Sequence, residues 1–388
     1  MASHQKLNIE PSSSAPRAAR GKFALRQATS LIIIFTILFP YARVLPVNTD
    51  IQPNFLIAIL LLGPFVITVR MKEVIVFTIF VALLILYTIA EPTSQSFRAW
   101  PAYLTPLLVM VFVRAMLTSE ANGRWLDRLM YMTFYPWVGF GVLQLLSGSL
   151  ILVTTFRAST TTNRGWTSFA PEPSAFGTVL FLYAAFFAAR GRPALAVVAL
   201  LTTALAAQSA LGLVYFAILA LAYLLLHITK QARWLLPISA FLILLTVVVD
   251  MRDILEILPD GSRVTTLVNH AIVSGSIQED NSVSSRVSDL ISAMSAVTEG
   301  SMLGEGFGGE KRLKSGWGAY AYELGWLGLT IAIGWIGYFL FRAKQMGRNV
   351  LASTGAIIVM LFSSTPLAMP FASFVIAALI YAPASAEG

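Results

Sequence analysis

Residues 164–177 contain the polar side chains whose types and spacing best fit a chemical role. They read Arg-Gly-Trp-Thr-Ser-Phe-Ala-Pro-Glu-Pro-Ser-Ala-Phe-Gly, so a cation, Arg164, and a carboxylate, Glu172, stand just before a long apolar run. Proline directly after Glu172 predicts a helix start, where an acidic residue can act as a cap. The same carboxylate could instead take a proton as a general base. The sequence leaves both roles of Glu172 open.

A second polar region, residues 251–316, is too long for a simple connection. Apolar residues recur at helical spacing in 284–299 and more weakly in 262–272, which predicts amphipathic helices that lie on the membrane surface or cap a helix bundle. The glycine-rich run 304–309 either brings backbone amides near a phosphate or forms a flexible turn. Acidic residues outnumber cations here, so any anion must be bound by individual cationic side chains. These cations are Arg252, Arg263, Arg286, Lys311, Arg312 and Lys314.

The elements that must position these regions are membrane helices. Hydrophobic residues make up 57% of the 388 residues, charged residues only 12%, and the mean hydropathy is +0.74. Apolar runs long enough to cross a hydrocarbon core of ~30 Å predict an all-α polytopic membrane protein with about twelve transmembrane helices. The predicted spans lie near residues 28–47, 53–69, 73–90, 100–118, 129–147, 173–189, 193–210, 212–228, 234–250, 318–341, 349–364 and 367–384.

Lysine and arginine set the orientation, because they are retained on the cytoplasmic side of short loops. Their distribution places both termini in the cytoplasm and the long loops 148–172 and 251–316 outside it. Residues 1–26 are predicted to be a disordered basic tail, and residues 27–384 a single transmembrane domain. The cations of the predicted cytoplasmic face are Lys6, Arg17, Arg20, Lys22, Arg26, Arg70, Lys72, Arg114, Arg124, Arg128, Arg190, Arg192, Lys230, Arg233, Arg342, Lys344 and Arg348.

Composition excludes several classes of function. The formal net charge of +8 is accounted for by membrane topology, so nucleic acid is not an expected partner, whereas the lipid bilayer is. The chain has no cysteine, and its three histidines do not stand at ligand spacing, so no metal site or cofactor is expected. Glu323 stands near the start of a predicted span, where a carboxylate needs a partner or must reach the membrane surface.

Three stretches together resemble the bacterial polysaccharide polymerase and O-antigen ligase superfamily. Residues 164–177 resemble its Arg-Gly, Glu-Pro-Ser, Gly element. Residues 286–294, followed by 303–308, resemble the arginine, amphipathic helix and Gly-x-Gly-x-Gly sequence of its large outer loop. Residues 322–328, Tyr-Glu-Leu-Gly-Trp-Leu-Gly, resemble the Glu-x-Gly-x-x-Gly start of the following span. The three occur in the family's order, mainly within residues 150–330.

The resemblance implies a metal-independent glycosyltransferase of the bacterial inner membrane that acts on undecaprenyl-pyrophosphate-linked oligosaccharides at the extracytoplasmic face. Glu172, Arg286 and Arg164 are then the expected catalytic residues. A chain-length regulator protein is a further potential partner. The expected substrate-binding residues are Arg157, Lys314, Arg263 and Glu323.

One departure bears on the reaction. Ligases of the family carry a histidine about nine residues before the glutamate of the third element, where this chain has Lys314 and Ser315. The difference favours a polymerase, which joins repeat units, over a ligase, which transfers finished polymer to an acceptor. A flippase for the same lipids is the alternative from another class, although the sequence shows no internal repeat of the kind common in transporters.

Overall fold

The computed structural model describes residues 17–42, 51–67, 69–90, 94–117, 120–149, 165–227, 288–289, 291–295, 298, 304, 313, 316–363 and 369–382. This part of the chain contains helices and no strands, which confirms the predicted all-α class there. Within it, four helices are long and apolar enough to cross a membrane: Met71–Ile89, Ala99–Met116, Trp125–Ser147 and Gly316–Met346. These helices indicate a membrane protein.

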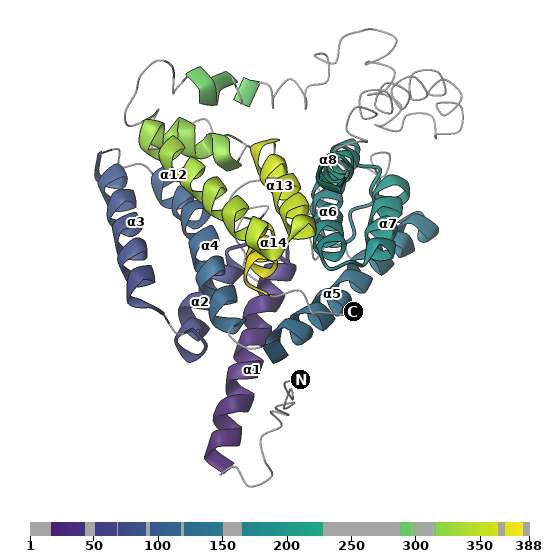
Figure 1. The fold of residues 1–388 in the computed structure, drawn as a ribbon, viewed down its shortest axis with the longest axis horizontal. Helices are drawn as coiled ribbons and strands as arrows, with labels where there is room; N and C mark the ends of the chain where they lie inside the picture. Colours follow the sequence, from purple (N-terminus) through teal and green to yellow (C-terminus); the bar gives the residue numbers. More distant parts are fainter. Residues whose placement is uncertain are drawn as a thin grey trace, which may run out of the picture.

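Figure 1 shows the helices as one bundle. In the first half they are α1 (Arg17–Leu38), α2 (Asn54–Leu62) with the 3₁₀ turn η1 (Gly63–Phe65), α3 (Met71–Ala90), α4 (Ser94–Met116) and α5 (Glu120–Ser147). In the second half they are α6 (Pro173–Ala189), α7 (Pro193–Thr202) with the π-helical turn η3 (Thr203–Ala207), α8 (Ala210–His227), α12 (Gly316–Met346), α13 (Arg348–Ser363) and α14 (Pro370–Tyr381).

Each of these α-helices overlaps a predicted span, whereas the span expected near 234–250 lies outside the described residues. Several of them are shorter apolar helices of 10–17 residues, so the twelve-span topology stays a prediction. Helix α1 begins at Arg17, inside the segment expected to be a tail. The alanines, arginines and lysine there are good helix formers, although they are too polar to count as part of a span.

Helix α6 lies at the centre of the bundle, with most of its side chains buried. It packs against α7, α8, α13 and α14, and α14 packs in turn against α4. The rings of Tyr183 on α6 and Phe371 on α14 are 4.9 Å apart between centroids. Helices α13 and α14 therefore lie between α6 and α12 (Figure 1).

An ion pair connects α5 to the turn after α6. Arg190 Nε lies 3.4 Å from Asp127 Oδ1, and the guanidinium carbon lies 5.4 Å from the centroid of the Phe186 ring. Burial lowers the pKa of Arg190, and the Asp127 carboxylate opposes that change. This contact fixes the end of α6 against α5.

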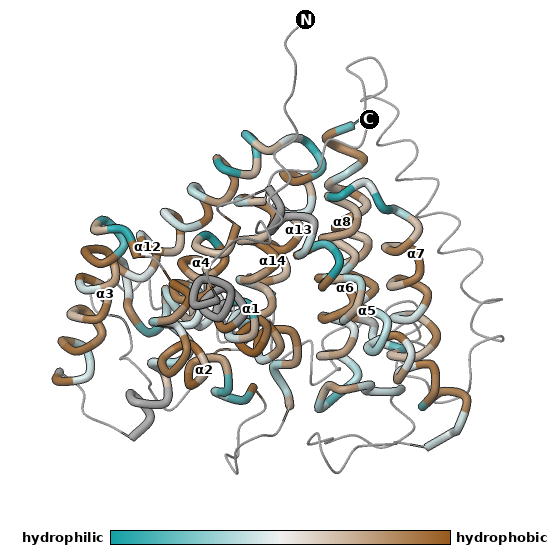
Figure 2. Tube along the Cα trace, turned by 90° about the horizontal axis from the view of Figure 1, so that it is seen from below, coloured by the Kyte–Doolittle hydropathy of each residue, from teal (hydrophilic) through white to brown (hydrophobic). Residues whose placement is uncertain are grey.

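Helices α3 and α7 consist largely of apolar residues, which are brown in Figure 2, and many of these side chains are exposed. On α3, Leu86 and Ile89 are 63% and 70% exposed. Apolar area in water is unfavourable by about 25 cal/mol per Å², so exposed faces of this kind are suited to an apolar surrounding. The exposed faces of α3 and α7 therefore fit a lipid environment.

The described residues of the long loop include helical ones at 288–289 and 291–295, within the predicted amphipathic helix 284–299. Ile291 and Met294 are exposed, whereas Asp289 and Ala293 are buried. Two apolar residues of the predicted stripe are thus exposed, whereas its other members lie outside the described residues. The other predicted amphipathic helix, 262–272, lies outside the described residues.

Candidate functional site

Residues 165–172, named here the braced segment, connect Arg164 to α6. Gln144 of α5 holds the middle of this segment, because its Oε1 accepts hydrogen bonds from the backbone amides of Thr167 at 3.2 Å and Ser168 at 2.8 Å. The Ser168 hydroxyl donates to the carbonyl oxygen of Trp137 at 2.8 Å. Since these buried polar groups have partners inside the protein, the segment has a defined conformation.

The other side of the braced segment packs on the break between α7 and α8. The amide of Trp166 donates to the carbonyl of Ala206 at 2.9 Å. Gly165 has φ of +102°, and a Cβ there would collide with the carbonyl oxygen of Ala207. A side chain at this position is therefore excluded both by space and by backbone conformation.

Gly177, the last residue of the motif, makes the same kind of contact one turn into α6. A Cβ on Gly177 would lie 2.7 Å from Cβ of Ser209, at the start of α8. The break there consists of the π-helical turn η3 and Gln208, whose φ is +48°. The glycines of the motif thus allow α6 and the braced segment to contact this break closely.

Glu172 is exposed, although most residues of the braced segment before it are buried. It occupies the N-cap position of α6, but its side chain makes no hydrogen bond to the helix amides. Instead, the Ser174 hydroxyl donates to Glu172 Oε1 at 2.5 Å. The carboxylate therefore lies accessible at the last residue of the braced segment, whose first residue directly follows Arg164 in the chain.

Glu323, the other acidic candidate, is buried and only 6% exposed. Its Oε2 accepts a hydrogen bond at 2.9 Å from the hydroxyl of Tyr103 on α4, and the rings of Tyr103 and Tyr320 meet edge to face at 4.9 Å. A buried carboxylate requires such a donor. Glu323 therefore satisfies the expectation of a partner, rather than extending to the membrane surface.

The helical backbone of α12 is interrupted two residues after Glu323. Gly325 has φ of +57° and ψ of −141°, and the two parts of the helix meet at this kink. Gly304 of the glycine-rich run lies against the same point, because a Cβ on it would be 2.6 Å from the amide nitrogen of Gly325. The structure thus places Gly304, a residue of the second stretch noted in the sequence, against the third stretch at 322–328.

Replacing Gly328 with alanine is expected to lower the free energy of unfolding by about 3 kcal/mol, the cost of overpacking a well-filled site. A Cβ at this position would collide with the carbonyl oxygen of Tyr320, across the kink. Gly337 of the same helix has open space where a Cβ would lie, with nothing within 4 Å, so Gly337→Ala is the matched control and should leave stability unchanged or higher. Equal thermal unfolding midpoints of the two variants in detergent would contradict the close contact between Gly328 and the Tyr320 carbonyl across the kink.

Glu172 and Glu323 lie on different helices, α6 and α12, with α13 packed against both. The remaining expected site residues, Arg157, Arg164, Arg263, Arg286 and Lys314, lie outside the described residues. Within the described part of the chain, no group of three or more histidine, aspartate or glutamate side chains could hold a metal ion.

Sequence reasoning did not single out Gln144 or Tyr103, the residues that hold the braced segment and Glu323. The available signal was a lone amide within the apolar run of α5, since a polar side chain in such a run needs a partner. No protein-family model matches the sequence, and no curated protein matches it. The chemistry of this site is therefore inferred from its own residues.

Proposed function

We propose that this protein is a polysaccharide polymerase of the bacterial inner membrane. In this proposal about twelve helices span the membrane, both termini are cytoplasmic, and the site containing Glu172 faces outward. The substrates are oligosaccharide repeat units linked to undecaprenyl pyrophosphate. The enzyme transfers a growing chain from its lipid to the sugar of a fresh lipid-linked unit.

The observation that best supports this proposal is the braced segment with Glu172 exposed at its end. Buried hydrogen bonds hold this segment on two sides, because its amides donate to Gln144 of α5 and to Ala206 of the break before α8. Catalytic groups must be held in place before the substrate arrives. The segment therefore has the rigidity that a carboxylate and the neighbouring Arg164 require if they act together.

The proposed reaction breaks the bond between the anomeric carbon of the donor sugar and the pyrophosphate oxygen. A hydroxyl oxygen of the acceptor sugar forms the new bond to that carbon, and its proton passes to the Glu172 carboxylate. The electron pair of the broken bond stays on the lipid pyrophosphate. Guanidinium groups of Arg164 and Arg286, assisted by Arg157 or Lys314, stabilise the charge on that leaving group, so this step requires no metal ion.

Deletion of the gene for this chain tests the proposal. We expect the mutant cells to accumulate a single repeat unit on its lipid carrier and to lack polymer, as measured by gel electrophoresis and mass spectrometry of extracted lipid-linked saccharides. Long polymer that stays on the lipid carrier would instead identify a ligase. Repeat units trapped in the cytoplasmic leaflet would identify a flippase, and either result would contradict the polymerase proposal.

A further inference from the structure

A cavity of about 690 Å³ lies between α3, α4, α12 and α14, near one end of these helices. Its lining includes four cationic side chains and one carboxylate: Arg70, Lys72, Arg114, Arg342 and Glu73. None of these residues takes part in the proposed glycosyl transfer. In the sequence the four cations served only as indicators of topology, whereas the structure brings them to one place.

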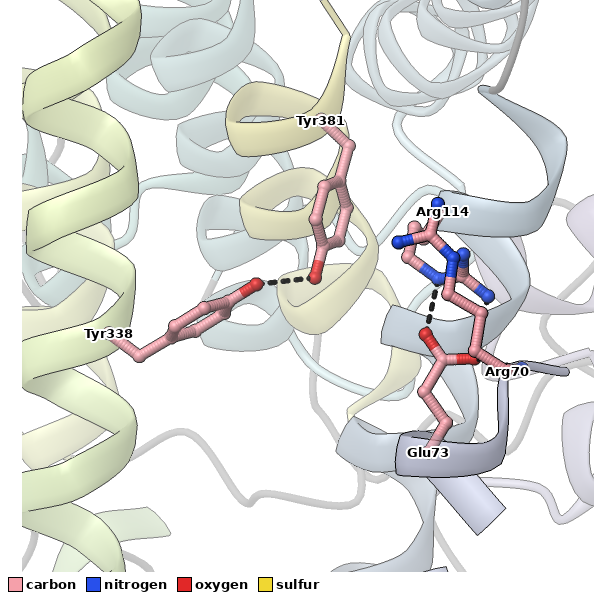
Figure 3. Close-up of polar contacts among 5 residues, drawn as sticks. All are labelled: Arg70, Glu73, Arg114, Tyr338 and Tyr381. Atoms are coloured by element: carbon pink, nitrogen blue, oxygen red, sulfur yellow. Dashed lines mark hydrogen bonds and ion pairs between the residues drawn. The ribbon is translucent and has the colours of Figure 1, made fainter. Parts of the chain in front are cut away.

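Glu73, the one carboxylate among the described lining residues, forms an ion pair with one of the cations. Arg114 contacts Glu73 with two nitrogens, Nε at 2.5 Å from Oε1 and Nη2 at 2.6 Å from Oε2. The backbone amide of Arg70 also donates to Glu73 Oε2 at 2.9 Å. Figure 3 shows this cluster, with the hydroxyls of Tyr338 and Tyr381 facing each other at 2.8 Å. Once Arg114 and Glu73 neutralise each other, the other cations give the cavity a net positive charge.

Those other cations are placed to bind an anion. The side chains of Arg70 and Lys72 are exposed at the start of α3. Arg342 uses Nη1 to bind Gln345 Oε1 at 2.8 Å, which orients its guanidinium group. Two arginines and a lysine arranged around one cavity match the oxygens of a phosphate group.

The rest of the cavity is apolar, with Val76, Met110, Ile331 and Trp335 among its lining residues. Val76 belongs to the exposed, lipid-facing side of α3, where it is 52% exposed. A free phosphate ion would gain nothing from this wall, whereas a hydrocarbon chain would. The pairing of a cationic end with an apolar wall that is continuous with the lipid-facing surface is therefore suited to an amphiphile.

We propose that this cavity binds an acidic phospholipid, with its phosphate against Arg70, Lys72 and Arg342 and one acyl chain along the apolar wall. The four cations are among those that the positive-inside rule places on the cytoplasmic face, and acidic lipids are bound by basic pockets between helices on that side. The proposal does not depend on the enzymatic one, because lipid binding is measured without any sugar substrate.

Titration of the purified full chain in detergent with phosphatidylglycerol, followed by native mass spectrometry, tests this inference. We expect one tightly bound lipid, and at least tenfold weaker binding of phosphatidylcholine. Arg70→Gln and Arg342→Gln should each weaken phosphatidylglycerol binding about fivefold, the loss typical of one cation near a lipid phosphate. Arg128→Gln is the matched control, because Arg128 is exposed on α5 and does not line the cavity, so this variant should bind as the wild type does.

The apolar half of the cavity is tested separately by Gly334→Leu. Gly334 lines the cavity, and a Cβ added to it would have nothing within 4 Å, so leucine fits there and occupies the space of the acyl chain without altering any charge. We expect at least fivefold weaker lipid binding, a loss about as large as that expected for removing one cation. Gly337→Leu, which is equally open but outside the cavity, should have no effect. Thermal unfolding midpoints establish that each variant is folded.

Three results would overturn the inference. Binding of phosphatidylcholine as tight as that of phosphatidylglycerol would exclude recognition of charge. Displacement of the lipid by inorganic phosphate, together with unchanged binding in Gly334→Leu, would indicate a site for free anions. Preference for a polyprenyl phosphate over phosphatidylglycerol would assign the cavity to the carrier lipid instead of a membrane phospholipid.

Discussion

Replacing Glu172 with glutamine is expected to lower the rate of polymer formation by about 10²- to 10⁴-fold, the usual contribution of a general base. Glutamine has nearly the same shape as glutamate but cannot take the proton of the acceptor hydroxyl. The measurement is polymer formed by membrane vesicles from the deletion strain, complemented with each variant and supplied with lipid-linked repeat units. Glu172→Asp keeps a carboxylate at a shorter reach and should retain an intermediate rate.

Stability distinguishes this role from helix capping. Because the Glu172 side chain makes no hydrogen bond to the amides of α6, the glutamine variant should unfold at nearly the same temperature as the wild type. A normal rate of polymer formation in that variant would exclude Glu172 as the base. A lost activity that parallels a lowered unfolding temperature would assign the residue to the structure of α6 instead.

Arg286→Ala is expected to abolish detectable polymer, with a loss of about 100-fold or more in rate. Its guanidinium group is proposed to stabilise the charge that develops on the pyrophosphate, which alanine cannot do. The measurement is polymer length on a gel, together with the amount of the variant in the membrane fraction. Because Arg286 belongs to a polar loop, we expect the variant to insert into the membrane at the normal level.

Two further variants make this experiment specific. Arg286→Lys keeps the positive charge but loses the two-pronged contact with phosphate oxygens, so an intermediate rate is expected. Arg128→Ala removes an exposed cation on α5, away from the proposed site, and should leave polymer formation unchanged. Polymer of normal length from Arg286→Ala would remove this residue from the mechanism and leave Arg164 as its candidate cation.

The helices themselves could be predicted from the sequence, since long apolar runs have few other solutions in lipid. Their breaks were harder to predict. Proline inside a helix can kink it, and Pro106 and Pro136 lie inside α4 and α5, but the non-helical backbone inside α12 is at a glycine, Gly325. A glycine in the sequence does not by itself predict a helix break, because its effect on the backbone depends on which residues pack against it.

The site was only partly predictable for a similar reason. The motif at 164–177 identified Glu172 from local spacing, and the structure places it at the start of α6 as expected. The braced segment could not be predicted, because Gln144 and Ala206 reach it from distant parts of the chain. Single-sequence periodicity carries information about neighbours one or two turns away, whereas such contacts depend on the packing of the whole bundle.

The cavity was also not predictable from the sequence, because it is formed by helices that lie far apart in the chain. Charge counting assigned Arg70, Arg114 and Arg342 to one side of the membrane, which is a statement about topology. Their convergence depends on how α3, α4 and α12 pack. A residue that serves as a topology signal in sequence can therefore also line a specific site.

The hydrogen bonds that hold the braced segment and Glu323 differ in how far apart their partners lie in the chain. Gln144 and Ser168 are 24 residues apart, whereas Tyr103 and Glu323 are 220 residues apart. Since a chain is synthesised from its N-terminus, Gln144 and Ala206, the hydrogen-bond partners that hold the braced segment, have both been made once α8 has emerged. The partner of Tyr103, in contrast, is made only when most of the protein has been translated. Premature termination between α8 and α12 would thus release a chain that contains these partners of the braced segment but lacks Glu323, the partner of Tyr103.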